Sequence, residues 1–345
     1  MSADVVLVTG GSGFIAQHCM LRLLKSGYRV RTTLRSPNRE PEVRAALKQG
    51  GQEAGDRLEF ATADLTSDNG WAQAATGCRY LLHVASPLPP SMPKDENELI
   101  VPARDGALRA LRAARDAGVE RAVLTSSFAA IGYGNVPAGG VYTEADWTDT
   151  SKPIAAYTKS KAIAERAAWD FIAREGGSLQ LATVNPVVVF GPALTADLSA
   201  STLLISRMLA GRVPAWPRMS VGIVDVRDVA DLHILAMINS QANGQRFMCA
   251  ADEPMLLRDI ARLLSDRMGH DGRKVATRQM PDWLVRLGGK FSPLLRATVP
   301  ELGRPKTTSN AKARQLLGWQ PRSSQEAVLA AARSLVELGV AGVGR

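Results

Sequence analysis

Residues 5–16, VVLVTGGSGFIA, decide the fold of the first part of this 345-residue chain. The apolar residues 5–8 predict a strand buried on both faces, and the amphipathic run after the turn predicts a helix. Between them, Gly10 and Gly13 allow backbone angles and close contacts that side chains would prevent. Backbone amides at the start of that helix can bind a pyrophosphate. A purely structural turn is the alternative for the spacing Gly10-x-x-Gly13-x-x-Ala16, and the rest of the chain decides between them.

Length and composition limit the classes of protein to which the chain can belong. It is long enough for one large domain or two closely joined ones, and no apolar run is as long as a membrane span. The first strand begins at once, so we expect no signal peptide and a cytoplasmic protein. Three separated cysteines predict reduced, buried thiols, and the spacing of cysteines and histidines predicts no metal site. The net charge of +9 is spread along the chain, which argues against a nucleic-acid partner and favours a cleft for a phosphorylated cofactor or a CoA ester.

Strands and helices alternate along the first half of the chain. Apolar runs predict strands at 28–34, 58–63, 80–85, 122–125, 179–184 and 187–190. Amphipathic runs predict helices at 40–54, 71–75, 97–117 and 155–175. The fold class is therefore α/β, a Rossmann-type doubly wound parallel sheet.

The second half of the chain is less regular. Strands are expected at 221–226 and 247–250, and helices at 194–211, 228–239, 256–268, 281–287 and 325–338. We assign residues 1–190, with about 221–250, to a dinucleotide-binding domain. About 191–220 and 251–345 form a smaller, mostly helical substrate lobe.

The residue at the end of the second predicted strand indicates which nicotinamide cofactor binds. An acid at this position holds the ribose diol of NAD, whereas an arginine suits the additional phosphate of NADP. Arg35 occupies it here, with Ser36 and Arg39 close behind. The sequence therefore favours NADPH and NADP+, with a solvated basic strand end as the alternative.

Several other strands end in residues that can meet a ligand, because open α/β sheets bind ligands at the carboxyl ends of their strands. Asp64 and Leu65 follow the third strand, where we expect the adenine edge. The fourth strand stops at residues 86–90, SPLPP. The next strand delivers Ser126 and Ser127 to the same edge. The long loop 132–153, rich in glycine and proline, is expected to be functional or mobile.

A tyrosine and a lysine share one face of the helix predicted at 155–175. Tyr157 and Lys161 lie four residues apart, which is one helical turn. Exposed pairs of this kind are common, so their meaning depends on the hydroxyl pair and the glycine turn upstream. A nearby ammonium lowers the pKa of a phenol, which is otherwise about 10, and makes it a better proton-transfer group.

Motifs along nearly the whole chain carry a family resemblance. They are TGGSGFIA at 9–16, Arg35, ADL at 63–65, HVASP at 83–87, LTSS at 124–127, YTKSK at 157–161, NPVVVFGP at 185–192, VDVRDVA at 224–230 and LLGWQP at 316–321. With these motifs the chain resembles the extended short-chain dehydrogenases/reductases. Within them it is most similar to dihydroflavonol reductases, cinnamoyl-CoA reductases and microbial aldehyde and ketone reductases.

The resemblance implies a role for each site residue. Tyr157 would protonate the developing alkoxide, Ser127 would donate a hydrogen bond to it, and Lys161 would activate the phenol and hold the nicotinamide ribose. Ser127 is preferred to Ser126 because it aligns with the catalytic serine of the family. The implied cofactor-binding residues are Gly10, Gly13, Phe14, Ile15, Arg35, Asp64, Leu65, Ala85, Ser86, Tyr157, Lys161, Pro186 and Val188.

Further residues have open interpretations. Asn185 and Pro186 shape the nicotinamide end of the cleft or only break a strand. Asp225 and Arg227 form a structural ion pair or contact the substrate. His83 is expected to pack near the cofactor. One wall of the substrate pocket is predicted to comprise Met208, Leu209 and residues 213–219, which include Trp216.

The leading hypothesis is an NADPH-dependent enzyme that reduces an aldehyde or ketone, aromatic carbonyl compounds included. It would act as a monomer or a homodimer. A sugar-nucleotide epimerase or dehydratase is a second hypothesis, which Arg35 disfavours. A CoA-thioester reductase is a third. A non-catalytic dinucleotide sensor is least favoured because both Tyr157 and Lys161 are present.

Overall fold

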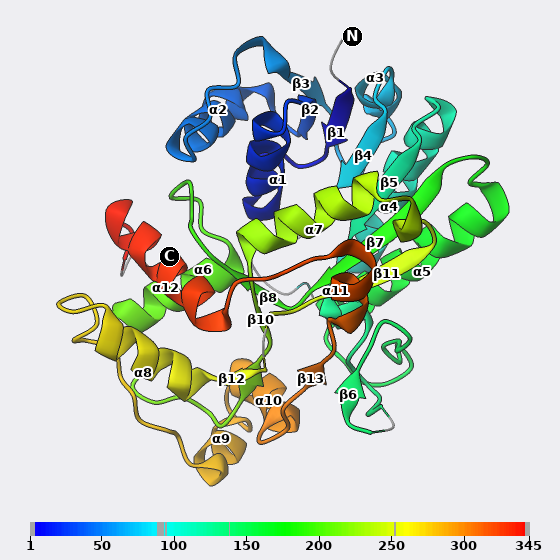
Figure 1. Ribbon diagram of the computed structural model, residues 1–345. Helices are drawn as coiled ribbons and strands as arrows, with labels where there is room; N and C mark the ends of the chain where they lie inside the picture. The colour runs from blue at the N-terminus through cyan, green and yellow to red at the C-terminus, as the bar shows by residue number, and fades with distance from the viewer. Residues whose placement is uncertain (1–3, 88–92, 94, 138, 252, 342–345) are drawn as a thin grey trace.

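A seven-stranded parallel sheet forms the centre of the computed structural model, which describes residues 4–87, 93, 95–137, 139–251 and 253–341 (Figure 1). Its strands, in spatial order β11-β7-β5-β4-β1-β2-β3, are Gln245–Cys249, Gln180–Pro186, Arg121–Thr125, Tyr80–His83, Val5–Val8, Arg29–Leu34 and Leu58–Thr62. The order reverses between β1 and β4, which is where such sheets open a crevice for a ligand. The prediction of a Rossmann-type doubly wound sheet is confirmed.

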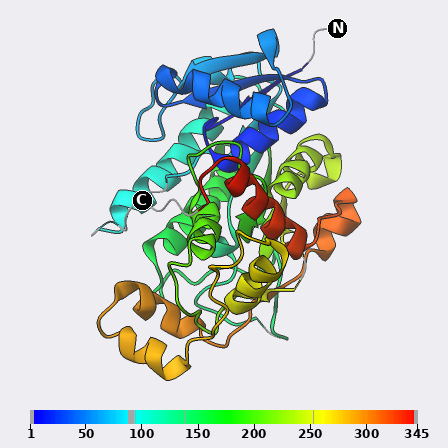
Figure 2. The ribbon, with the colours of Figure 1, turned by 90° about the vertical axis from the view of Figure 1, so that its left-hand side faces the viewer.

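Helices cover both faces of this sheet (Figures 1 and 2). Successive residues of β1 point to opposite faces, so Val6 and Val8 join one apolar core and Leu7 the other. The first core includes α1 (Phe14–Lys25), α2 (Glu40–Gln49), α7 (Val226–Ile238) and α11 (Ala311–Leu317). The second includes α3 (Trp71–Ala75), α4 (Asn97–Asp116) and α5 (Ala156–Glu175).

The C-terminal lobe is mostly helical and has its own apolar core. The strands β8 (Val188–Phe190) and β10 (Ile223–Asp225) pair with each other outside the main sheet. Phe190 and Ile223 pack against α6 (Ala200–Leu209), α8 (Leu257–Arg267) and α12 (Ser324–Glu337). The remaining elements of the lobe are β9 (Ser220–Val221), β12 (Met255–Leu256), α9 (Asp282–Gly288) and α10 (Pro293–Thr298).

Many element boundaries differ from the sequence predictions by one or more residues, and the predicted strand 221–226 is divided between β9 and β10. Three further differences concern β7 and two helices. The chain stays in β7 through Pro186, which pairs with Cys249, and leaves the sheet only afterwards. The helix predicted at 40–54 ends at Gln49, because Gly51 adopts a left-handed φ of 79°. The helix predicted at 194–211 begins at Ala200, where the Ser199 hydroxyl caps it by accepting from the Thr202 amide.

Two C-terminal segments return to the part of the molecule that is built on the seven-stranded sheet. The strand β13 (Thr307–Thr308) pairs with β6 (Val141–Tyr142) in the long loop after β5. The helix α11 and Trp319 join the core around α1 and α7, although they fall within 251–345. The sequence contained no periodic signal for these short elements.

None of the helices in the described part of the chain is both long and apolar enough to cross a membrane.

Candidate active site

The glycine turn after β1 is held against the end of β2. The Gly10 amide donates to Thr33 Oγ1 at 3.0 Å, and the Gly11 amide donates to the Thr33 carbonyl at 3.0 Å. Gly10 has a φ of 72°, and a Cβ there would lie 3.1 Å from Ala85. A Cβ at Gly11 would lie 2.3 Å from Thr32 Oγ1, so this position also requires glycine, which the sequence pattern did not single out.

The helix α1 begins directly after this turn. Gly13 is its N-cap residue and has no side chain to satisfy the first amides. Phe14 and Ile15 therefore present backbone donors that have no acceptor within the helix. Together with the helix dipole, these amides form a site suited to a phosphate group.

Thr9 fixes the end of β4 beside the turn. Its Oγ1 accepts from the amides of Val84 at 3.0 Å and Ala85 at 2.9 Å, and it pairs with His83 Nδ1 at 3.0 Å. Burial, together with the charge of Lys161, lowers the pKa of His83 to about 3, so this ring is neutral. Ala85 and the half-buried Ser86 are thus held at the crevice, whereas residues 88–90 of the predicted proline stop lie outside the described residues.

Two arginines follow β2 and differ in their partners. Arg35 is exposed, and it has no ion-pair partner among the residues that the structure describes. Arg39 forms ion pairs with Glu42 and with Asp197, both at 2.7 Å. Arg35 therefore remains available for an anion at the strand end, while Arg39 spans from this strand end to the loop before α6.

Asp64 and Leu65 lie at the end of β3. The Asp64 carboxylate accepts from the amide and the hydroxyl of Thr66, at 2.7 and 2.6 Å. These hydrogen bonds, chiefly that from the hydroxyl, hold the pKa of Asp64 below its usual value. Leu65 packs against Gly106 of α4, where a Cβ would lie 2.7 Å from it. Both residues are half-buried at the same sheet edge.

Tyr157, Lys161 and Ser127 come together at the carboxyl ends of the central strands. Lys161 is almost fully buried on α5, with its Nζ 6.0 Å from the centre of the Tyr157 ring. Burial raises the pKa of Tyr157, and its interaction with the Ser127 hydroxyl partly offsets this. The pKa lowering that the sequence led us to expect from Lys161 is not found, and the phenol is protonated at neutral pH.

The two serines after β5 have different partners. Ser126 is buried and its Oγ donates to the carboxylate of Glu165 at 2.5 Å. Ser127 Oγ accepts from the Ala129 amide at 3.1 Å and lies beside Tyr157. The geometry therefore agrees with the preference for Ser127.

Comparisons with known proteins agree with this arrangement. The NAD dependent epimerase/dehydratase family matches residues 6–250 of the chain. The chain belongs to this family of extended short-chain dehydrogenases/reductases.

Similar proteins in this family include several reductases. Cinnamoyl-CoA reductase CAD2 of Medicago truncatula is 35% identical over 269 residues, which are 76% of this chain and 80% of that protein. A putative NADPH-dependent methylglyoxal reductase of Candida albicans is 32% identical over 286 residues, 76% of this chain and 82% of that protein. The yeast methylglyoxal/isovaleraldehyde reductase Gre2, solved with NADPH, superposes with a TM-score of 0.79 at 26% identity, covering 97% of this chain and 99% of that one.

The NP motif of this reductase-like chain lies at the end of β7. Asn185 is fully buried, and its Nδ2 donates to the Glu165 carboxylate at 2.7 Å and to the Ser127 carbonyl at 3.3 Å. Pro186 ends the strand, and Val188 begins β8 in the other lobe with a half-buried side chain. The motif thus positions the serine segment and marks where the chain crosses between lobes.

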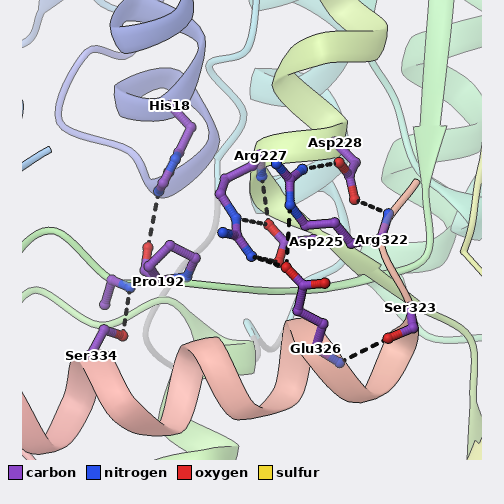
Figure 3. Close-up of polar contacts among 10 residues, drawn as sticks. His18, Pro192, Asp225, Arg227, Asp228, Arg322, Ser323, Glu326 and Ser334 are labelled. Atoms are coloured by element: carbon purple, nitrogen blue, oxygen red, sulfur yellow. Dashed lines mark hydrogen bonds and ion pairs between the residues drawn. The ribbon is translucent and has the colours of Figure 1, made fainter. Parts of the chain in front are cut away.

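Asp225 and Arg227 form a structural ion pair at the junction of the lobes (Figure 3). Arg227 binds the buried Asp225 at 2.7 Å and Glu326 of α12 at 3.3 Å. Beside them, Arg322 pairs with Asp228, and His18 of α1 donates to the Pro192 carbonyl at 2.9 Å. Figure 3 shows these side chains facing one another across the junction, which favours the structural interpretation of the pair.

The predicted pocket wall around Trp216 is wrong in part. Met208, Leu209 and Trp216 are 1%, 4% and 3% exposed and belong to the apolar core of the lobe. Trp216 Nε1 donates to the Ala276 carbonyl, so its polar edge is also used within the lobe. The apolar pattern of these side chains therefore indicates packing in the core of the lobe rather than ligand binding.

A group from the C-terminal segment lies near Tyr157 and was missed from the sequence. Lys306, just before β13, lies 3.4 Å above the centre of the Tyr133 ring and pairs with Glu301 at 2.8 Å. Burial raises the pKa of Tyr133 to about 12, with smaller contributions from Glu301 and Tyr157. No spacing rule connects these residues, because the β6–β13 pairing brings them together.

The cysteines are buried free thiols, as expected from the sequence. Among the described residues, no group of three or more His, Cys, Asp or Glu side chains is arranged to hold a metal ion.

Proposed function

We propose that this protein is an NADPH-dependent carbonyl reductase that converts an aldehyde or ketone to an alcohol. The observation that carries the proposal is the half-buried Tyr157, with the Ser127 hydroxyl and the Lys161 ammonium beside it, at the sheet edge that holds the glycine turn. The reductase relatives support the reaction class.

The residues at the crevice fit a phosphorylated dinucleotide. Gly10 leaves room where a Cβ would meet Ala85, and Phe14 and Ile15 offer amides to a pyrophosphate. Arg35 is free to bind the 2′-phosphate, and Asp64, Leu65 and Ser86 line the adenosine side. Tyr157, Lys161, Pro186 and Val188 would hold the nicotinamide side. The bound cofactor supplies the hydride.

Tyr157, Ser127 and Lys161 complete the reduction at the carbonyl oxygen. As the carbonyl carbon gains a hydride, its oxygen gains negative charge, and the protonated Tyr157 donates its proton there. Ser127 stabilises the developing charge by a hydrogen bond. Lys161 then favours the phenolate that remains until a solvent proton restores it.

The similarity to a cinnamoyl-CoA reductase favours aromatic carbonyls as one substrate class. Phe128, which follows Ser127, is 8% exposed and packs in an apolar cluster with Tyr142, so it does not identify the substrate. Methylglyoxal and isovaleraldehyde, named for Gre2, are the first aliphatic substrates to test.

Replacing Tyr157 by Phe tests the reaction directly. Tyr157→Phe should lower kcat at least about 10²-fold, since general acid catalysis contributes about that much, and leave NADPH affinity nearly unchanged. Tyr80→Phe is the control, because this buried phenol lies at the opposite end of β4. NADPH absorbance with a panel of aldehydes, ketones and β-keto esters provides the readout. Near wild-type turnover by Tyr157→Phe would refute the proposal.

Reduction of a CoA thioester is the second candidate, favoured by the identity of 35% to a cinnamoyl-CoA reductase. Cinnamoyl-CoA with NADPH should then release one free CoA thiol for each aldehyde formed, which a thiol reagent detects. Absence of thiol release while simple aldehydes are reduced would exclude it. Stoichiometric loss of NADPH in either assay separates both candidates from an epimerase, which regenerates its cofactor.

A further inference from the structure

A fully buried carboxylate lies on the catalytic helix behind the active site. Glu165 follows Lys161 by one turn of α5 and Tyr157 by two, and its side chain is 0% exposed. Its oxygens accept hydrogen bonds from five side chains. The donors are Ser126 Oγ at 2.5 Å, Asn185 Nδ2 at 2.7 Å, Arg246 Nε at 2.7 Å, Thr183 Oγ1 at 3.1 Å and Trp169 Nε1 at 3.4 Å.

Four of these donors come from three adjacent strands or their ends, and the fifth, Trp169, lies on α5 itself. Ser126 directly follows β5 and precedes Ser127, Thr183 and Asn185 belong to β7, and Arg246 belongs to β11. Asn185 also donates to the Ser127 carbonyl, at 3.3 Å. The carboxylate therefore reaches the serine segment by two routes, through Ser126 and through Asn185.

Stability does not account for this arrangement. A buried ion pair such as Glu165–Arg246 often contributes no more to stability than well-packed apolar side chains of the same size. A network with many satisfied hydrogen bonds does, however, fix the relative positions of its members. The geometry it fixes here is the position of the serine segment relative to α5.

We propose that Glu165 is a positioning residue that holds the ends of β5 and β7 against α5, and so sets Ser127 at its working distance from Tyr157. The inference rests on the proposed roles of Tyr157, Ser127 and Lys161. A shift of about 1 Å in such a group can cost about 10²-fold in rate.

The carboxylate also acts on the charge of Lys161. Burial lowers the pKa of Lys161 to about 8, and the negative Glu165 opposes this effect. The other titratable groups facing Lys161 are Tyr157 on α5 and the neutral His83 on β4, while Arg246 faces Glu165 from β11. Without Glu165, Lys161 loses its proton at lower pH, so activity falls at lower pH on the alkaline side.

The test compares Glu165→Gln, Ser126→Ala and Ser334→Ala by steady-state kinetics from pH 6 to 10, NADPH binding by fluorescence, and thermal unfolding. Ser334 is the control, since its hydroxyl is also buried and donates a hydrogen bond, to the Ala331 carbonyl of α12, while it accepts one from the Ala193 amide, far from Tyr157 in the other lobe. Glu165→Gln should lower kcat at least about tenfold and move the alkaline limb to lower pH. Ser126→Ala should lower kcat by about threefold to tenfold at unchanged NADPH affinity, whereas Ser334→Ala should change kcat less than about twofold.

Each result decides the proposal. If Glu165→Gln does not fold, Ser126→Ala alone decides it, because the backbone and the carboxylate remain. A kcat for Ser126→Ala within twofold of that for Ser334→Ala, or an unchanged alkaline limb for folded Glu165→Gln, would overturn it. If Tyr157→Phe is inactive, the proposed reductase function stands even when the Glu165 or Ser126 variants overturn the positioning role. If Tyr157→Phe is active, the proposed reductase function is refuted, whatever the Glu165 and Ser126 variants do.

Discussion

Two clusters of arginine and carboxylate differ in how much of the arginine is buried. In the first, behind the catalytic helix, Glu165 is 0% and Arg246 is 9% exposed. In the second, at the lobe junction, Asp225 and Asp228 are 0% and 2% exposed, but their partners Arg227 and Arg322 are 33% and 34% exposed. The carboxylates of the two clusters are thus equally buried, whereas their arginine partners are not.

The difference separates a rigid site from an adjustable junction. Arg246 and Glu165 connect adjacent parts of one sheet and its covering helix, where neither charge can reach water. Arg227 and Arg322 connect α7 to α12 and the segment before it, where water can replace a lost contact. Charge burial therefore predicts large effects in the first cluster and small effects in the second.

The largest expected effect comes from removing Arg246. Arg246→Met leaves Glu165 buried without its cation, which should lower the free energy of unfolding by about 3–5 kcal/mol. Arg227→Met should cost less, about 1–3 kcal/mol. It also leaves a buried carboxylate without its cation, but Asp225 still accepts from the backbone amide of residue 227 at 2.9 Å and water can replace the partly exposed guanidinium. Urea unfolding measures both, and equal losses would break the distinction.

Acid should destabilise the fold as a whole through three buried histidines, of which His18 lies at the lobe junction. Burial lowers the pKa of His83 to about 3, and of His18 and His233 to about 4. Since unfolding restores values near 6.5, stability is full above that pH and falls as pH drops, by about 2 kcal/mol for each histidine at pH 5. Burial raises the pKa of Asp228 to about 6, which offsets part of the loss.

Thermal unfolding at pH 7, 6 and 5 follows this loss. His18→Gln should remove about a third of the pH slope, because one of three buried histidines no longer titrates. The same slope in His18→Gln and wild type would contradict neutrality of His18 at the junction.

Arg35 represents a third case, an arginine without an ion-pair partner in the described part of the chain. Arg35→Ser should weaken NADPH binding at least about tenfold, or about 1.4 kcal/mol, while NADH binding and stability stay the same. Arg44→Ser is the control, since Arg44 pairs with Glu40 on α2 at 2.9 Å. Cofactor titrations by fluorescence give both affinities, and equal losses for NADPH and NADH would remove the phosphate role.

The smallest effect is expected at the exposed pair between Arg39 and Asp197. Asp197→Asn should change the free energy of unfolding by less than about 1 kcal/mol, because both side chains are partly in water and Arg39 keeps Glu42. Urea unfolding checks this, and a loss as large as that of Arg246→Met would show that exposure does not rank these pairs.

The sequence predicted the sheet, and it allowed residues of the candidate site to be proposed, because both depend on local patterns. Apolar runs of four to seven residues marked the central strands, and the glycine turn, Arg35 and the Tyr157–Lys161 pair each occupy short, regular spacings. Glu165, four residues after Lys161, could have been found by extending the same helical face.

The remaining parts depend on contacts between distant segments. Arg246 reaches Glu165 only because β11 joins the sheet beside β7, and Lys306 reaches Tyr133 only through the β6–β13 pair. Trp216 was misinterpreted because an apolar side chain has the same pattern whether it lines a pocket or fills a core. The order of strands and helices along the chain predicts neither the contacts between distant segments nor the role of Trp216.

The β6–β13 pair also has a consequence for biosynthesis. During synthesis, Ser127, Tyr157 and Lys161 leave the ribosome long before Thr307 and Thr308 do. Until then the loop that follows Ser127 lacks its partner strand. A messenger RNA truncated before the codon for Thr307 would thus encode a protein that has every proposed catalytic residue but lacks the strand that pairs with the loop beside them.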